Sequence, residues 1–130
     1  MTSYRTPLGR VRGLGAAKHG VGHFITQRVT GSALVFLVLW AVWQGLGVAH
    51  ADFAGAVTWL RSPWHAVPAG LLIGVACLHM NIGMQVIIED YIQRPVTKVG
   101  LLVLSLFVCW LTAAVGVFSI LKVAFGGGAY

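Results

Sequence analysis

The chain has 130 residues, of which 58% are hydrophobic and only 9% are charged, whereas typical globular domains carry about 25% charged residues. A water-soluble surface cannot be built from this composition, which excludes a self-contained soluble enzyme and predicts a single domain with most of its exterior in lipid. The net charge of +6 does not indicate nucleic-acid binding, because the aromatic residues lie mainly in or beside apolar runs. Five of the nine basic residues lie before residue 30 and lead into an apolar run, which is the pattern of membrane topology.

The first part of the chain predicts an arm followed by a membrane-spanning helix. Residues 1–22 are rich in glycine and lack apolar periodicity, which indicates a cytoplasmic N-terminal arm rather than a cleaved signal peptide. The sequence from Gly31 to Ala49 is almost wholly apolar. Extending this run back to Phe24 supplies the roughly 20 residues that cross the hydrocarbon core. The first transmembrane helix is therefore predicted at about 24–49.

An amphipathic segment separates this helix from the next. Apolar side chains from Phe53 to Trp64 recur at i, i+3, i+4, i+7 and i+11. This spacing predicts a short helix lying in the membrane interface. The second transmembrane helix is predicted at about 66–88, with Pro68 in its first turn, where a missing N–H costs little.

The remaining sequence predicts a charged loop over 89–98, a third transmembrane helix over about 99–123, and a tail over 125–130. The third run contains no charged residue or histidine between Val99 and Leu121, and its Ser105, Thr112 and Gly116 are typical of helix-packing positions. Both cysteines of the chain lie within apolar runs, which indicates packing roles and excludes a disulfide framework or an iron–sulfur site.

The basic residues predict the orientation in the membrane. Seven of the nine Lys and Arg residues fall in the N-terminal segment and the 89–98 loop, and only Arg61 and Lys122 fall on the other side. The positive-inside rule then places the N-terminus in the cytoplasm and the C-terminus outside. The predicted fold is an all-α integral membrane protein in which residues 23–124 form three transmembrane helices, N-in/C-out, with a short interfacial helix between the first two.

His79 is the main candidate for chemistry because it is an ionisable residue in the middle of an apolar run, where a polar group requires a partner. Helical spacing places the small residues Ala76 and Gly83 one turn to either side of it. They leave a trough in which a flat macrocycle could bring its iron to an imidazole nitrogen. Alternatively, His79 hydrogen-bonds a neighbouring helix and the small residues allow close packing. One histidine cannot complete a bis-imidazole site, so the local pattern by itself favours this alternative.

Further candidate residues lie at the predicted cytoplasmic boundary. Asp90 and Tyr91 lie about 16 to 18 Å of helix rise beyond His79. The tyrosine hydroxyl could donate to a carbonyl of a lipid-soluble ligand while the acid and water supply protons, or the pair could be an interfacial anchor with a solvated carboxylate. Arg28, where the first helix begins, could reach lipid phosphates or pair bidentately with a carboxylate.

Two sequence blocks resemble a known family. The block from His79 to Asp90-Tyr91 has the pattern H-x3-G-x6-D-Y, and together with the segment from His23 to Arg28 it resembles the smaller membrane anchor, or D subunit, of succinate dehydrogenase (respiratory complex II). The order of the blocks and the three-helix length agree over essentially the whole chain. The C subunit of the same complex reads His-Arg-x-Thr-Gly where this chain reads Gln27-Arg28-Val-Thr-Gly31, so the resemblance is to the D type.

This resemblance implies specific residue roles. His79 matches the axial ligand of a b-type haem whose other axial histidine comes from the larger anchor. Tyr91 matches the hydrogen-bond donor to ubiquinone, and Asp90 matches the acid beside it. Arg28 matches an arginine near the haem propionates or the quinone pocket. None of these residues would be catalytic by itself, because succinate is oxidised at a flavin in another subunit.

The resemblance also implies partners and a location. The partners would be the flavoprotein subunit, the iron–sulfur subunit and the C-type cytochrome b anchor, together with the lipid bilayer. The location would be the bacterial cytoplasmic (inner) membrane. The alternative function, from a different class, is a non-redox accessory or transport subunit in which His79 and Gln85 line a polar path between helices.

Overall fold

Three long helices dominate the computed structural model, which describes residues 4, 6–12 and 20–126. They are α2 (Gly20–Val48), α4 (Pro63–Tyr91) and α5 (Pro95–Phe125), and each is long and apolar enough to cross a membrane. The prediction of an all-α fold with three transmembrane helices is therefore confirmed. At 1.5 Å of rise per residue, each helix exceeds the roughly 30 Å hydrocarbon core, so its ends extend beyond that core.

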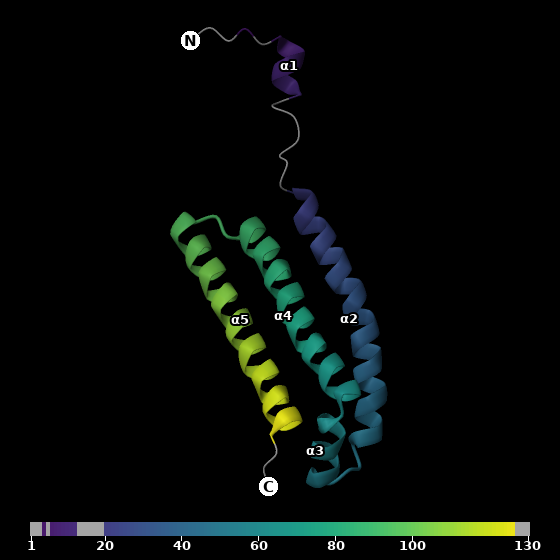
Figure 1. The fold of residues 1–130 in the computed structure, drawn as a ribbon. Helices are drawn as coiled ribbons and strands as arrows, with labels where there is room; N and C mark the ends of the chain where they lie inside the picture. The colour runs from purple at the N-terminus through teal and green to yellow at the C-terminus, as the bar shows by residue number, and fades with distance from the viewer. Residues whose placement is uncertain (1–3, 5, 13–19, 127–130) are drawn as a thin grey trace.

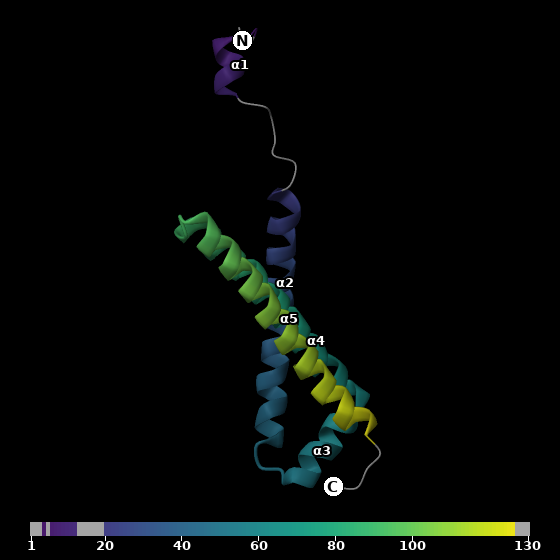
Figure 2. The same ribbon diagram turned by 90° about the vertical axis from the view of Figure 1, so that its left-hand side faces the viewer.

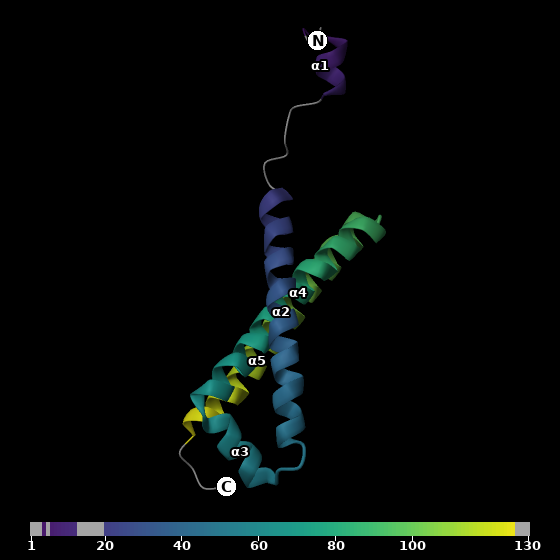
Figure 3. The ribbon, with the colours of Figure 1, turned by 90° about the vertical axis from the view of Figure 1, so that its right-hand side faces the viewer.

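The three long helices form a row with α4 in the middle (Figure 1). Helix α4 packs against both α5 and α2, whereas α2 and α5 do not pack on each other. In side view, α2 crosses the α4–α5 pair at an angle (Figures 2 and 3). The start of α2 and the turn between α4 and α5 lie at one end of the row, and the short helix α3 lies at the other end.

A row of helices buries few side chains. The described residues that are buried are Thr30, Ala66, Cys77, Ile82, Ile88 and Cys109. Large apolar side chains such as Trp43 and Phe118 remain exposed. Lipid chains solvate such side chains as well as a protein core does, so association between the helices depends on close packing and on polar contacts rather than on apolar burial. The uncovered faces remain available to lipid or to other subunits.

The contact between α4 and α5 depends on a small residue. A Cβ atom at Gly116 would lie 2.9 Å from Cγ2 of Ile73, which is closer than packed carbon atoms approach. The glycine therefore lets the two helices come together, as small residues do in membrane helix pairs. The sequence prediction of a helix-packing role for Gly116 is confirmed.

The helix starts differ from the sequence prediction at three places, the first being α2, which begins at Gly20 and not at about 24. Helix α4 begins at Pro63, three residues earlier than predicted, so Pro68 lies inside the helix and not in its first turn. The earlier proline takes the first helical position, which its fixed φ angle suits. Pro68 lacks the N–H that would bond to the carbonyl of Trp64, but that carbonyl lies in the first turn beside a largely exposed side chain.

The connection between α4 and α5 is also shorter than the predicted loop over 89–98. Helix α4 continues through Tyr91, and α5 begins at Pro95. Glu89, Asp90 and Lys98 are therefore helical, and Arg94 lies in the turn between the two helices. Lys98 donates a 2.8 Å hydrogen bond to the carbonyl of Glu89 and joins the two helix ends.

Two short helices complete the described structure. Helix α3 (Phe53–Arg61) is capped by Asp52, whose carboxylate accepts a 2.8 Å hydrogen bond from the N–H of Gly55. An amphipathic helix therefore lies where the sequence predicts one, and its position in the membrane interface stays a prediction. Helix α1 (Pro7–Val11) lies within the predicted arm, for which no helix was expected. Residues 1–3, 5, 13–19 and 127–130 of the predicted arm and tail lie outside the described residues.

The close approach at Gly116 predicts a specific loss of stability. Gly116→Ala should destabilise the protein in detergent by about 1–3 kcal/mol, because the added methyl group pushes α5 away from Ile73. Gly100→Ala is the matched control in the same helix, since no atom lies within 4 Å of a Cβ there. Thermal unfolding of the two variants makes the comparison. Equal melting temperatures would contradict the packing role.

Candidate functional site

His79 lies where α4 crosses α2, and a glycine on α2 makes room for its ring. A Cβ atom at position 31 would lie 3.2 Å from Cε1 and 3.8 Å from Nδ1 of the imidazole. Gly31 therefore lets the ring sit against the backbone of α2. The sequence prediction considered only the small residues on the same helix as the histidine, and the closest glycine belongs to the neighbouring helix.

Hydrogen bonds define which nitrogen of His79 carries the proton. The hydroxyl oxygen of Thr30 lies 2.9 Å from Nδ1 of His79 and 2.7 Å from the backbone carbonyl of Thr26. A hydroxyl has one hydrogen, and the carbonyl can only accept, so the Thr30 hydroxyl donates to the carbonyl and accepts from the N–H at Nδ1. The neutral imidazole then carries its lone pair on Nε2, which is the tautomer that binds a metal through that nitrogen.

Among the described residues, the Nε2 atom of His79 has one weak hydrogen-bond contact. It lies 3.5 Å from the side-chain nitrogen of Gln27, a distance at the limit of a hydrogen bond. The amide oxygen of Gln27 is buried without a hydrogen-bond partner in the described structure. The amide nitrogen of Gln27 lies close to Gly83, where a Cβ atom would be 3.7 Å from it. A ligand that approaches Nε2 of His79 would displace the Gln27 amide, which is only weakly hydrogen-bonded.

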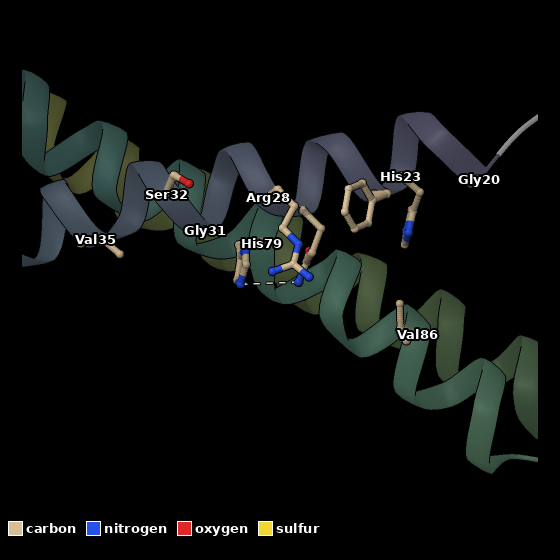
Figure 4. A pocket seen from close by; sticks show the side chains of 10 residues that line it. Gly20, His23, Arg28, Gly31, Ser32, Val35, His79 and Val86 are labelled. Atoms are coloured by element: carbon tan, nitrogen blue, oxygen red, sulfur yellow. Dashed lines mark hydrogen bonds between the residues drawn. The ribbon is translucent and has the colours of Figure 1, made fainter.

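The histidine faces a groove of about 650 Å³ between α2 and α4. Figure 4 shows the side chains of His23, Arg28 and His79 extending from the two helices into this region. The groove is lined by Gly20, His23, Phe24, Gln27, Arg28, Gly31, Ser32, Val35, His79 and Val86. No carboxylate is among these residues, so the groove combines apolar walls with imidazole and guanidinium groups.

Two side chains near the end of this groove, His23 and Arg28, have N–H groups that could donate hydrogen bonds to a ligand. Nε2 of His23 is buried and has no hydrogen-bond partner in the described structure. The guanidinium of Arg28 lies over the ring of Phe24, 5.2 Å from its centroid, and makes no ion pair with any described residue. A flat, largely apolar ligand with acidic side groups has the chemistry that this groove complements.

The other two predicted site residues do not share this groove. Tyr91 is 78% exposed and lines a separate apolar groove of about 350 Å³ between α4 and α5. Met80, Met84 and Ser105 are also part of its wall. Asp90 is exposed and lines neither groove. The structure therefore brings Arg28 and His79 together and places Tyr91 on another side of α4.

Sequence reasoning missed the direct partners of the histidine. Gln27, Thr30 and Gly31 occupy positions i, i+3 and i+4 of α2 and thus share one helix face. That face carries a buried hydroxyl and an amide near the start of an otherwise apolar helix. Two polar side chains and a glycine on one face of a mostly apolar helix indicate that a polar group of the facing helix lies against them.

The fold and the groove define the chain as a helical integral membrane protein with an imidazole site between two of its spans. Over residues 2–115 the chain matches the family described as succinate dehydrogenase/fumarate reductase transmembrane subunit, and it belongs to this family.

Curated relatives extend the similarity over much of the chain. A protein of Rickettsia bellii (strain RML369-C) is 31% identical over 90 residues, covering 69% of this chain and 72% of the relative. A Rickettsia conorii protein is 27% identical, covering 84% of this chain and 87% of the relative. A Paracoccus denitrificans protein is 25% identical, covering 95% of each chain. All three are named succinate dehydrogenase hydrophobic membrane anchor subunit.

Proposed function

We propose that this chain is the D-type anchor of a succinate:quinone oxidoreductase, in which it shares a b-type haem with the other anchor subunit and forms part of the ubiquinone-reduction site. The observation that carries the proposal is the state of His79, whose Nδ1 donates to Thr30 and whose Nε2 faces the groove between α2 and α4. Membership of the family supports the assembly in which such a site would operate.

The residues around the groove fit a haem. Nε2 of His79 is the nitrogen available to iron, and its one hydrogen-bond contact among the described residues is the 3.5 Å approach of the Gln27 amide. Arg28 and the unpartnered Nε2 of His23 are donors for carboxylate groups at the end of the groove. When bound, the haem supplies one-electron redox chemistry. The larger anchor would provide the second axial imidazole.

Arg28 and Tyr91 have separate roles in this proposal. Arg28 lines the groove of His79 and not the groove of Tyr91, which favours a propionate over quinone as its partner. The exposed phenol of Tyr91 would donate a hydrogen bond to a quinone carbonyl. Asp90, next to it at the end of α4, would pass protons from water to the reduced quinone.

The chain would act only together with partner subunits. Its two cysteines are buried between helices, so it offers no thiolate cluster for iron–sulfur chemistry. Succinate oxidation would occur in the flavoprotein subunit, with electrons passing through the iron–sulfur subunit. The C-type cytochrome b anchor would cover the open side of the groove that contains His79.

The positions of the polar residues weigh against a transport function. Asn81 and Gln85 line a groove between α4 and α5, whereas His79 faces α2. The side chain of Gln85 also donates a 2.9 Å hydrogen bond to Glu89 in its own helix. The histidine and the amides therefore do not line one continuous path through the described helices.

We place the N-terminus in the cytoplasm of a bacterial inner membrane. The start of α2 and the 92–94 turn lie at the same end of the row (Figure 1), and residues 1–28 together with 89–98 carry seven of the nine Lys and Arg residues. A membrane-impermeant thiol reagent on intact cells tests the orientation. Ala51→Cys should be labelled in intact cells, and Gln93→Cys should be labelled only after permeabilisation. The opposite pattern would invert the topology.

Removing the imidazole should remove the haem signal. In the purified complex, His79→Ala should abolish or strongly perturb the reduced b-type absorbance spectrum, because iron loses one axial ligand. His50→Ala is the matched control, since His50 lies in the exposed turn after α2. An unchanged spectrum in the His79 variant would reject the ligand assignment. A colourless wild-type complex would favour a non-redox subunit.

Removing the phenol hydroxyl should affect only the quinone reaction. Tyr91→Phe should lower quinone reductase activity about tenfold, the effect of losing a hydrogen bond worth about 1.4 kcal/mol. Succinate oxidation with a soluble dye acceptor should persist, because that reaction does not need the quinone site. Tyr4→Phe, at a fully exposed tyrosine, is the matched control. Equal loss of both activities would count against a quinone role.

A further inference from the structure

We propose that Thr30 is the positioning residue for His79, fixing the imidazole's tautomer and ring orientation and thereby the strength of the bond from Nε2 to iron. This inference rests on the proposed haem role of His79. Thr30 itself does not line the groove, so its effect on a ligand there would pass entirely through the histidine.

The geometry around Thr30 leaves its hydroxyl one role. Thr30 is 6% exposed, and it is the buried polar residue of the described chain. Its hydroxyl lies 2.7 Å from the carbonyl of Thr26 and 3.2 Å from the carbonyl of Gln27, so its hydrogen is used within α2. Threonine in a helix commonly forms this bond to the preceding turn. The remaining lone pairs face Nδ1 of His79 at 2.9 Å.

Thr30 and its neighbour hold the ring from two directions. The hydroxyl engages Nδ1, and the backbone at Gly31 lies against the Cε1 edge, where a Cβ would be 3.2 Å away. Both residues belong to α2, although the imidazole belongs to α4. The ring orientation therefore depends on the crossing of α2 over α4, and neither helix sets it alone.

This arrangement has a chemical consequence for a ligand on Nε2. A histidine that donates from Nδ1 to a fixed acceptor is oriented and is a more basic ligand at Nε2. Without the acceptor, Nδ1–H would be left unpaired inside the protein, and the ring would lose its preferred tautomer. A less basic axial ligand stabilises ferric iron less, so the midpoint potential of the haem would rise and the haem would be held less tightly.

The test uses the assembled complex with Thr30→Val and Thr30→Ser. Valine keeps the shape and removes the acceptor, whereas serine keeps the hydroxyl. We expect Thr30→Val to weaken haem binding roughly tenfold or more, to raise the midpoint potential and to alter the ferric electron paramagnetic resonance signal. Thr30→Ser should restore all three toward the wild type. Thr26→Val is the matched control, because that hydroxyl bonds only to the carbonyl of Gly22, one turn away from the histidine.

Each outcome decides the proposal. The proposal would be overturned if the Thr30→Val complex kept the wild-type midpoint potential and electron paramagnetic resonance signal. It would also be overturned if the valine and serine variants shifted these two quantities equally, because that result would indicate a packing role only. If Thr30→Val does not assemble, Thr30→Cys replaces it, because the weaker acceptor sulfur should give an intermediate shift, and no shift would overturn the proposal. If the wild-type complex contained no haem and His79→Ala did not change its absorbance spectrum, the proposed function itself would be refuted.

Discussion

The contact between His79 and Thr30 is the constraint on which the arrangement of α2 and α4 depends. An imidazole in the middle of an apolar helix must find a hydrogen-bond partner, because lipid offers none. Here α2 supplies that partner, and Thr30 is its buried residue among 29 in the helix. A helix that is apolar on all sides has little preference for the face that it turns to a neighbour. The polar contact therefore sets its rotation and its register against α4.

The central position of α4 separates two chemical environments. One groove lies between α2 and α4 and contains His79, and the other lies between α4 and α5 and contains Tyr91. The two residues are also about 18 Å apart in helix rise. A ligand of the imidazole and a ligand of the phenol would thus be bound by the same helix without competing for the same space. The second groove is lined mostly by apolar side chains.

The sequence predicted the three spans and the main candidate residue for physical reasons that hold in any bilayer. Backbone groups in lipid must bond internally, so long apolar runs become helices, and an ionisable residue within them is conspicuous. It did not predict the helix ends, because Pro63 and Pro95 begin helices where charge and proline also resemble loop signals. It also missed Thr30 and Gly31 as partners of His79, because the mostly apolar pattern of α2 does not give its rotation, and only the short polar face of Gln27 and Thr30 indicates it.

The two sequence interpretations of His79 are compatible because an imidazole has two nitrogens. Nδ1 forms the hydrogen bond to a neighbouring helix that one interpretation expected, and this bond leaves the lone pair on Nε2 that the other interpretation requires. A small residue contributes to this arrangement, since Gly31 permits the close approach of α2 to the imidazole. A polar contact that satisfies one nitrogen in the bilayer is therefore a condition for using the other nitrogen as a ligand, and helix packing and ligand binding depend on the same few atoms.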